Sequence, residues 1–319
     1  MFDDILSDFI AAIRDMMAEM LKGSYNALFD NVNGQISTIA ADVSVTPANY
    51  SNWGASVYTV IKTISDDVIL PIGVLIITAL MCYELINAVL EKNAMHEMDS
   101  AFIFKWLMRA CISVLLLSYT LDISLAIFDL GGELATSVSS KFTASSSIDS
   151  SSFEWDTMIE EYVKGLDSDA DGDGEYDKAD NDKYTHSTGE IIGMALIAWI
   201  CKIIFLAMWV IIEVSLVGRM IEIFLYLSIA PIPFATLTNR EWGNIGTNYV
   251  RMLAALALQA VLIVMCVGMY GFIIKNLKFT TAAGYDLSSA TLQLLACSVA
   301  LLTAIRGSKN FAMSIMNAH

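Results

Sequence analysis

Long, uninterrupted apolar runs dominate this sequence and decide which kind of fold is open to it. A stretch of about 20 mostly apolar residues crosses the hydrocarbon core of a bilayer as an α-helix. The chain is 56% hydrophobic and only 16% charged, whereas soluble domains are about 25% charged. We therefore predict an all-α integral membrane protein with about five transmembrane helices, which occupy roughly residues 68–90, 102–130, 191–217, 250–274 and 287–305.

A further apolar piece, residues 220–230, stops at Ala230-Pro231-Ile232-Pro233. Proline interrupts a helix because it lacks an N–H and its ring clashes with the preceding turn. The piece holds only about 11 residues, too few for a crossing. We interpret residues 220–237 as a proline-broken hairpin at the inner face, outside the five spans.

This interpretation fixes an orientation with the N-terminus outside and the C-terminus inside. Cytoplasmic segments of membrane proteins carry an excess of lysine and arginine. Lys275 and Lys278 are left on the outer side. The basic residues that then lie near the cytoplasmic face are Lys92, Lys105, Arg109, Arg219, Arg240, Arg251, Arg306 and Lys309.

The N-terminal residues 2–22 repeat apolar side chains at three- and four-residue spacing, which predicts an amphipathic helix. Its polar face carries aspartate and glutamate, so we expect its apolar face to meet protein outside the membrane, not anionic lipid. The predicted organisation is an extracytoplasmic helix at 1–22, an extracytoplasmic segment at 23–67, a membrane hairpin at 68–130, an acidic extracytoplasmic loop at 131–187, and a membrane region at 188–319 with three helices, the broken hairpin and a short cytoplasmic C-terminus.

The acidic loop contains the sharpest motif in the chain. Residues 169–180 fit the pattern D-x-D-x-D-G-x-x-D-x-x-D, in which alternating carboxylates converge and Gly174 permits the sharp turn. Hard cations such as calcium take oxygen ligands in loops of this kind. The motif resembles thrombospondin type 3 and dockerin calcium repeats, because Asp180 replaces the longer glutamate of an EF-hand. We predict a structural calcium site with the ligands Asp169, Asp171, Asp173, Glu175, Asp177 and Asp180.

A disordered acidic linker is the alternative for this loop. Between Gly131 and Ser187 there are 14 acidic residues and four lysines. This charge argues against nucleic-acid binding by the segment, because phosphates require clusters of lysine and arginine.

Ionisable residues inside predicted spans are costly and face partners or water, and four of them are candidates for such a role. Glu84 and Arg109 are expected at similar depth near the inner ends of their helices, where they can pair. Asp122 and Lys202 lie near the middle of theirs. These two either neutralise each other or line an aqueous path.

Signatures of catalysis do not occur in the sequence. There is no G-x-x-x-x-G-K-[ST] phosphate loop, and His96-Glu97 lacks the second histidine of a zinc protease helix. The five cysteines lie in apolar stretches without a CxxC pattern. We expect a protein that is not an enzyme and binds no nucleotide.

The order of elements, the Ala230-Pro231-Ile232-Pro233 break and the following Thr238-Asn239-Arg240-Glu241-Trp242-Gly243 stretch resemble the TrbL-type membrane subunit of type IV secretion systems. The resemblance covers roughly residues 55–315 and is greatest to versions from conjugative elements of Gram-positive bacteria. It implies a non-enzymatic channel or scaffold subunit in the cell membrane, which forms a ring-like homo-oligomer, often fivefold. The implied partners are separate ATPases and other secretion-system subunits, with a DNA–relaxase substrate in transit.

Two other functions remain open on the sequence alone. A secondary transporter or ion channel would use Asp122, Lys202 and the break at Pro231 as its binding site. Transporters with inverted repeats show matching interruptions in both halves, and this chain has one strong break and no internal repeat. A sensory or scaffold protein would use the calcium loop to bind an extracellular partner.

Overall fold

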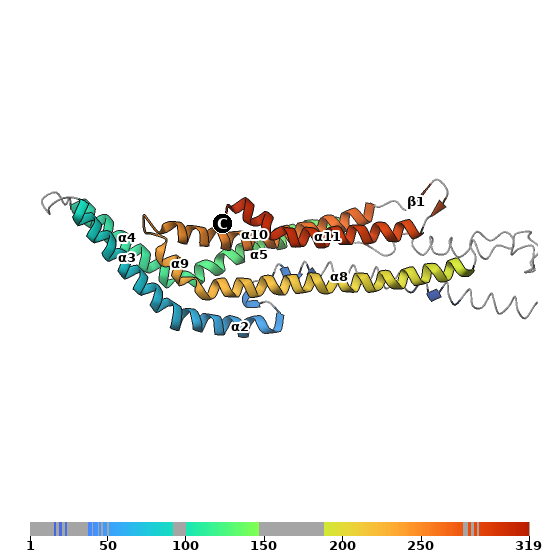
Figure 1. The fold of residues 1–319 in the computed structure, drawn as a ribbon, viewed down its shortest axis with the longest axis horizontal. Helices are drawn as coiled ribbons and strands as arrows, with labels where there is room; N and C mark the ends of the chain where they lie inside the picture. Colours follow the sequence, from blue (N-terminus) through green and yellow to red (C-terminus); the bar gives the residue numbers. More distant parts are fainter. Residues whose placement is uncertain are drawn as a thin grey trace, which may run out of the picture. The chain divides into compact units, whose positions relative to one another are not determined.

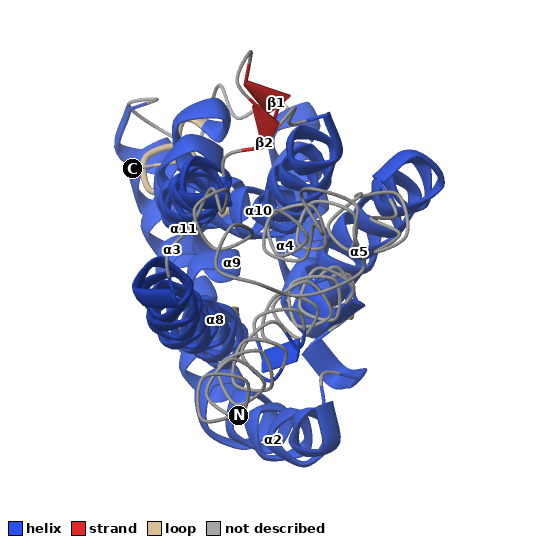
Figure 2. Cartoon of the chain, turned by 90° about the vertical axis from the view of Figure 1, so that its right-hand side faces the viewer, coloured by secondary structure: helices blue, strands red, loops and turns tan. Residues whose placement is uncertain are grey.

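The described parts of the chain are helical apart from two short strands, as the computed structural model shows in Figures 1 and 2. The structure describes residues 51–91, 100–146, 188–276, 280–281, 284–285 and 287–318, with a few residues between 16 and 49. The elements are a 3-10 turn at Pro47–Asn49, α2 (Ser51–Ile64), a π-helical turn at Ser65–Ile69, α3 (Leu70–Glu91), α4 (Ser100–Ser118), α5 (Thr120–Ser146), α8 (Thr188–Ile229), α9 (Pro231–Thr236), α10 (Gly243–Asn276), β1 (Thr280–Thr281), β2 (Gly284–Tyr285) and α11 (Leu287–Met316). The strands pair antiparallel, with Thr280 opposite Tyr285.

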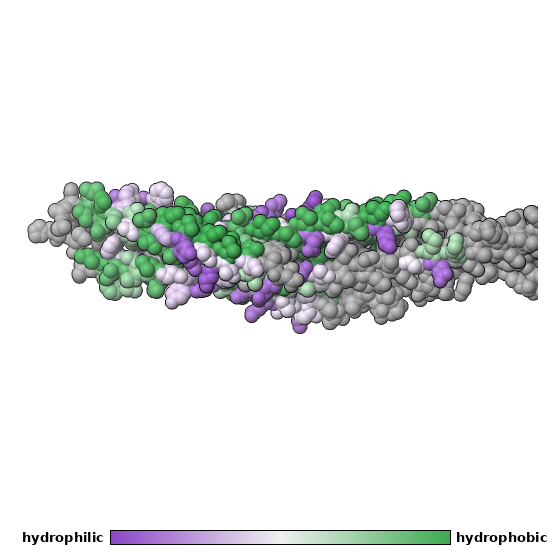
Figure 3. Space-filling model, turned by 90° about the horizontal axis from the view of Figure 1, so that it is seen from below, coloured by the Kyte–Doolittle hydropathy of each residue, from purple (hydrophilic) through white to green (hydrophobic). Residues whose placement is uncertain are grey.

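Four helices are long and apolar enough to cross a membrane, and a fifth crossing is made if α4 and α5 count as one bent span. Large apolar side chains on these helices are exposed, for example Leu75 and Leu90 at 70% each. They give the surface the extended hydrophobic areas seen in Figure 3. The predicted all-α membrane fold with about five crossings is confirmed. The four helical spans are Gly54–Asn87, Leu196–Ile229, Gly243–Ile273 and Thr291–Met316.

The second predicted span, 102–130, is not one straight helix. It bends by 65° between α4 and α5, and α5 continues to Ser146, past the predicted end. Two hydroxyl groups bond to backbone carbonyls at the bend. Ser118 Oγ donates to the carbonyl of Val114 at 2.9 Å, and Thr120 Oγ1 donates to that of Leu117 at 2.8 Å. Such back-bonding competes with the helical ladder and bends helices.

The third predicted span and the short piece before Pro231 form a single helix, α8, of 42 residues. The sequence interpretation that set residues 220–230 apart as a separate hairpin arm is therefore wrong. The predicted break itself is in place, because α8 ends at Ile229 and α9 begins at Pro231. The helix continues past Arg219 because this side chain is buried and bonded within the bundle.

The first span starts earlier than its apolar run, since α2, the π-helical turn and α3 follow one another without a gap. Pro71, close to the start of the predicted span 68–90, lies well inside the observed span Gly54–Asn87. A proline cannot donate to the carbonyl four residues before it, and its ring crowds that carbonyl. The wider π turn at Ser65–Ile69 lies directly before Pro71 and interrupts the regular ladder there.

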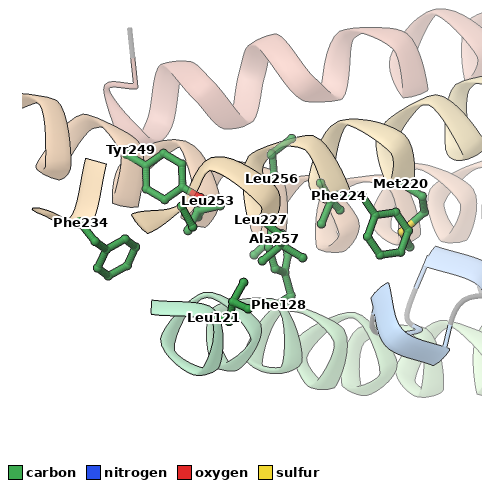
Figure 4. Packing of buried hydrophobic residues seen from close by; sticks show 12 residues of the cluster. Leu121, Phe128, Met220, Phe224, Leu227, Phe234, Tyr249, Leu253, Leu256 and Ala257 are labelled. Carbon is green, nitrogen blue, oxygen red and sulfur yellow. The ribbon is translucent and has the colours of Figure 1, made fainter. Parts of the chain in front are cut away.

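The chain divides into two compact units, and the larger set of contacts belongs to the unit of residues 40–139, 214–265 and 305–319. Its main core is shown in Figure 4. Leu121 and Phe128 of α5 point toward α8 and α10, and the Phe234 and Tyr249 rings lie at 75° to each other, with 5.8 Å between ring centroids. Further members of the cluster are Met220, Ile223, Phe224, Leu227, Ala230, Leu253, Leu256 and Ala257.

The other unit comprises residues 1–39, 140–213 and 266–304. Within it, the Tyr270 hydroxyl and the Ser298 hydroxyl lie 2.6 Å apart in a hydrogen bond. Gly268 is packed against the ring of Phe142, where a Cβ would clash with the ring. The glycine therefore allows this part of α10 to approach α5 closely.

Candidate functional site: the polar network at the proline-broken segment

The proline-broken segment lies against the α3–α4 hairpin, which α9 contacts on both helices (Figure 1). Five of its six residues are buried, and Pro231 occupies the first helical position, where a missing N–H is tolerated. Gly73 of α3 permits the approach, because a Cβ there would lie 3.2 Å from the Pro231 carbonyl oxygen. The break is therefore an internal packing element of its unit.

Glu84 of α3 is the centre of a polar network at this place. Its Oε2 accepts a hydrogen bond from Arg109 Nη1 of α4 at 3.1 Å. Its Oε1 accepts from Asn239 Nδ2 at 3.0 Å and from the backbone N–H of Arg240 at 3.3 Å. The Glu84 side chain is only 14% exposed, and a carboxylate that is mostly buried needs such partners. Helix α3, helix α4 and the segment before α10 thus meet at the Glu84 carboxylate.

Asn239 uses the other end of its amide to start α10. Its Oδ1 accepts hydrogen bonds from the backbone N–H groups of Glu241 and Trp242, each at 2.9 Å. An asparagine in this position satisfies donors that a helix start leaves open. Because its Nδ2 holds Glu84 at the same time, the beginning of α10 is tied to α3. Thr238 adds a hydrogen bond between its hydroxyl and that of Ser113 of α4.

Arg219 is buried inside the same unit, with 7% of its surface exposed. Its Nη2 donates to the carbonyl oxygen of Leu256 at 3.1 Å and so joins α8 to α10. The guanidinium also borders a cavity of about 10 Å³, which is about the volume that one water requires. Nearby, Tyr249 donates to the Tyr226 carbonyl at 2.6 Å. These bonds fix α10 against α8.

A second ion pair connects α8 to the C-terminal helix. Lys309 Nζ lies 2.5 Å from Glu222 Oε1, with side-chain exposures of 36% and 27%. In the sequence interpretation both residues are near the inner face. The pair holds the last part of α11 beside α8 within the unit.

The structure brings one of the two predicted pairs together. Glu84 and Arg109 are hydrogen-bonded, as described above. Asp122 and Lys202 are both exposed and belong to different units. Whether they neutralise each other or line an aqueous path stays a prediction.

The predicted calcium ligands, residues 169–180, lie outside the described residues, as does most of the 2–22 helix. In the part of the chain that the structure describes, no three histidine, cysteine, aspartate or glutamate side chains lie together as a metal site would require. The polar network there consists of cations, amides and one carboxylate, which suits positioning of helices.

Sequence reasoning missed the roles of Asn239, Thr238 and Ser113. Asn239 stands four residues before Gly243, where α10 begins, and asparagine is a preferred helix-capping residue. That signal could have indicated the start of the helix. The bond to Glu84 had no signal in the sequence, because 155 residues separate the two positions.

Comparison with known proteins identifies the family of this chain. The profile described as "TrbL/VirB6 plasmid conjugal transfer like protein" matches residues 32–168 and 163–231, which is more than half of the chain. No curated protein matches the sequence. The matched region contains Glu84, Arg109 and the α8–α9 break, and the whole chain has several membrane-crossing helices. The chain therefore belongs to the TrbL/VirB6-like family of plasmid conjugal transfer proteins and is a multi-pass membrane subunit of that machinery.

Proposed function

We propose that this protein is a non-enzymatic channel or scaffold subunit that takes part in moving a DNA–protein substrate across the cytoplasmic membrane. The observation that carries the proposal is the match to the conjugal transfer family over residues 32–231. The multi-pass helical fold supports it, since a translocation subunit has to be embedded in the bilayer. Energy would come from separate ATPases, because the sequence has no phosphate-binding loop.

Gene deletion tests this proposal directly. Transfer of the conjugative element to a recipient should be lost in the deletion strain, while growth is unchanged. The full-length gene supplied in trans should restore transfer. Normal transfer from the deletion strain would refute the proposal, and slower growth with normal transfer would favour a transporter instead.

The oligomer is the second part of the proposal. We propose a ring-like homo-oligomer, with five copies as the expected number, that assembles with other secretion-system subunits. A channel wide enough for a polymer needs walls from several chains, because the core of one unit is filled by side chains such as Leu227 and Leu253. Light scattering of the detergent-solubilised protein should give a multiple of the 34.9 kDa chain. A strict monomer would contradict the ring.

The orientation is the third part. We propose that the N-terminus and the 131–187 segment lie outside and the C-terminus inside, because most basic residues then lie at the cytoplasmic face. Fusions of alkaline phosphatase and green fluorescent protein to each terminus distinguish the two orientations. Phosphatase activity should appear only with the N-terminal fusion, and fluorescence only with the C-terminal one.

The calcium site is the fourth part. We propose that residues 169–180 bind calcium, because carboxylates and a glycine occupy the positions that calcium loops use. Calcium titrated into the purified full-length protein should give binding heat that Asp171→Ala removes. Asp149→Ala, which changes an acidic residue outside the motif, is the matched control. Equal heats for the two variants would contradict the site.

A further inference from the structure

Helix α5 carries three kinds of face, and one of them is polar and exposed. Asp122, Ala126, Asp129, Glu133 and Thr136 follow each other at spacings of four, three, four and three residues, which places them on one side of a helix. All five are exposed. We call these five residues the acidic face of α5.

The other two faces of α5 have different surroundings. One packs into the core, where Leu121, Phe128 and Ala135 are buried. The third is apolar and exposed, with Leu130 at 61% and Leu134 at 52%. An exposed leucine face beside an exposed carboxylate face means that α5 meets two different media, one apolar and one polar.

The rotation of α5 is fixed by a close helix contact. A Cβ on Gly131 would lie 2.9 Å from both the Cβ and the carbonyl oxygen of Ala257, so the two backbones touch at this point. Gly131 lies on the side of α5 that faces α10, away from Asp129 and Glu133. The acidic face therefore cannot turn into the core without separating α5 from α10.

The same contact gives the depth of the acidic face. Ala257 lies well inside the Gly243–Ile273 span, away from both of its ends. Ser124 of α5 lies beside the hydroxyl of Tyr249 of α10, and these two residues precede Gly131 and Ala257 in their helices. Because both contacts follow the same order along the chain, α5 and α10 run in the same direction through this unit. Asp122 is thus near one end of the span, and Asp129 and Glu133, two residues on either side of Gly131, lie inside it.

Ionised carboxylates at this depth are not compatible with lipid, because hydrocarbon neither solvates them nor bonds to them. Asp122, Asp129 and Glu133 also form no ion pair among the described residues. We infer that the acidic face lines a water-filled passage that enters the membrane beside α5 and concentrates cations. The inference rests on the proposed function, since a translocation subunit is embedded in the bilayer, and it names an aqueous path distinct from the path of the DNA. Such a wall repels phosphate, so a DNA strand would not travel along it.

Thiol accessibility in native membranes tests the inference. The five cysteines are replaced by alanine in the full-length chain, and single cysteines are placed at Ala126→Cys and Thr136→Cys on the acidic face. Leu130→Cys and Leu134→Cys are the matched controls, one step round the same helix. None of these changes removes a carboxylate. Membrane-impermeant cationic and anionic methanethiosulfonates are the probes.

Positions 126 and 136 should react with the cationic probe, and 130 and 134 should not. The cationic probe should react about tenfold faster than the anionic one, because the carboxylates attract it. In the double variant Asp129→Asn/Glu133→Gln, the ratio of the cationic to the anionic reaction rate should fall toward one. Unreactive 126 and 136, or equal rates for both probes, would overturn the inference and show that lipid or protein covers the face.

Two further measurements make the result decisive. If the cysteine-free chain does not reach the membrane, the four single cysteines are introduced into the wild-type chain, which keeps its native cysteines. The labelling of the wild-type chain is then subtracted from that of each variant. Element transfer is measured in the same strains. Transfer that depends on the gene, combined with unreactive 126 and 136, would refute the passage and leave the proposed function in place.

Discussion

Asn239 donates a hydrogen bond from Nδ2 to Glu84 Oε1 at 3.0 Å, across 155 residues of sequence. The same side chain caps the turn that begins α10 through its Oδ1. A single amide thus couples the local start of one helix to the packing of another, and this coupling can be measured.

Asn239→Ala should lose both the cap of α10 and the bond to Glu84. Asn239→Ser should lose only the bond to Glu84, because serine can also cap a helix. Removal of a helix cap costs about 1 kcal/mol, and a lost hydrogen bond to a carboxylate costs about 1.5–3 kcal/mol. We expect unfolding free energies in the order wild type, Asn239→Ser, Asn239→Ala. Thermal unfolding in one detergent gives the order, and equal stability of serine and alanine variants would argue against the cap.

The Glu84–Arg109 pair is best measured by a double-mutant cycle. Arg109 is 36% exposed and Glu84 only 14%, so solvent screens one partner more than the other. We expect a coupling energy of about 1 kcal/mol between Glu84→Gln and Arg109→Gln. Glu84→Gln alone should destabilise more than Arg109→Gln, because it also weakens the bonds that Asn239 and Arg240 donate. A coupling energy of zero would mean that the pair does not hold α3 to α4.

Two glycines provide a matched test of helix packing. Gly131→Ala places a methyl group 2.9 Å from Ala257, and overpacking of this kind costs about 1–3 kcal/mol. Gly218 of α8 has no atom within 4 Å of its missing Cβ. Gly218→Ala should therefore be neutral or stabilising by up to about 1 kcal/mol, since alanine favours helix. Opposite signs in thermal unfolding are the expected result, and an unaffected Gly131→Ala protein would contradict the close contact.

Tyr249→Phe removes one hydrogen bond and keeps the ring. The hydroxyl donates to the Tyr226 carbonyl at 2.6 Å, and the ring packs in a T-shaped arrangement with Phe234. We expect a loss of about 1 kcal/mol in unfolding free energy. Tyr83→Phe is the control, because Tyr83 is 45% exposed. A similar loss in both variants would show that the Tyr249 bond contributes nothing specific.

The membrane fold and the position of the break could be predicted from the sequence, because both depend on local physical chemistry. Hydrophobic length identifies a span, and proline at 231 and 233 stops a helix wherever it lies. The Glu84–Arg109 contact followed from equal depth on neighbouring helices of a hairpin. Each of these inferences needs only residues close together in sequence or a simple topology.

The errors come from interactions that hydropathy does not contain. Arg219 looked like the end of a span, but it is buried and bonded to Leu256, so α8 continues. At the bend at Tyr119, the hydroxyls of Ser118 and Thr120 donate in the direction of the preceding turn. A serine or threonine in an apolar run does not reveal this direction by its identity. The acidic face of α5 was also missed, because the predicted boundary after residue 130 assigned Asp122 and Asp129 to a span and Glu133 to a loop.

The first span has a consequence for the lipid around the protein. Gly54–Asn87 runs for 34 residues, roughly 51 Å at the helical rise, whereas a bilayer core is about 30 Å thick. A helix of this length is accommodated by tilt or by local thickening of the bilayer, and each ångström of mismatch has an energetic cost. The acyl-chain length of the surrounding lipid therefore acts on the tilt of this helix. Membrane thickness becomes a variable that can set the conformation of the transfer machinery.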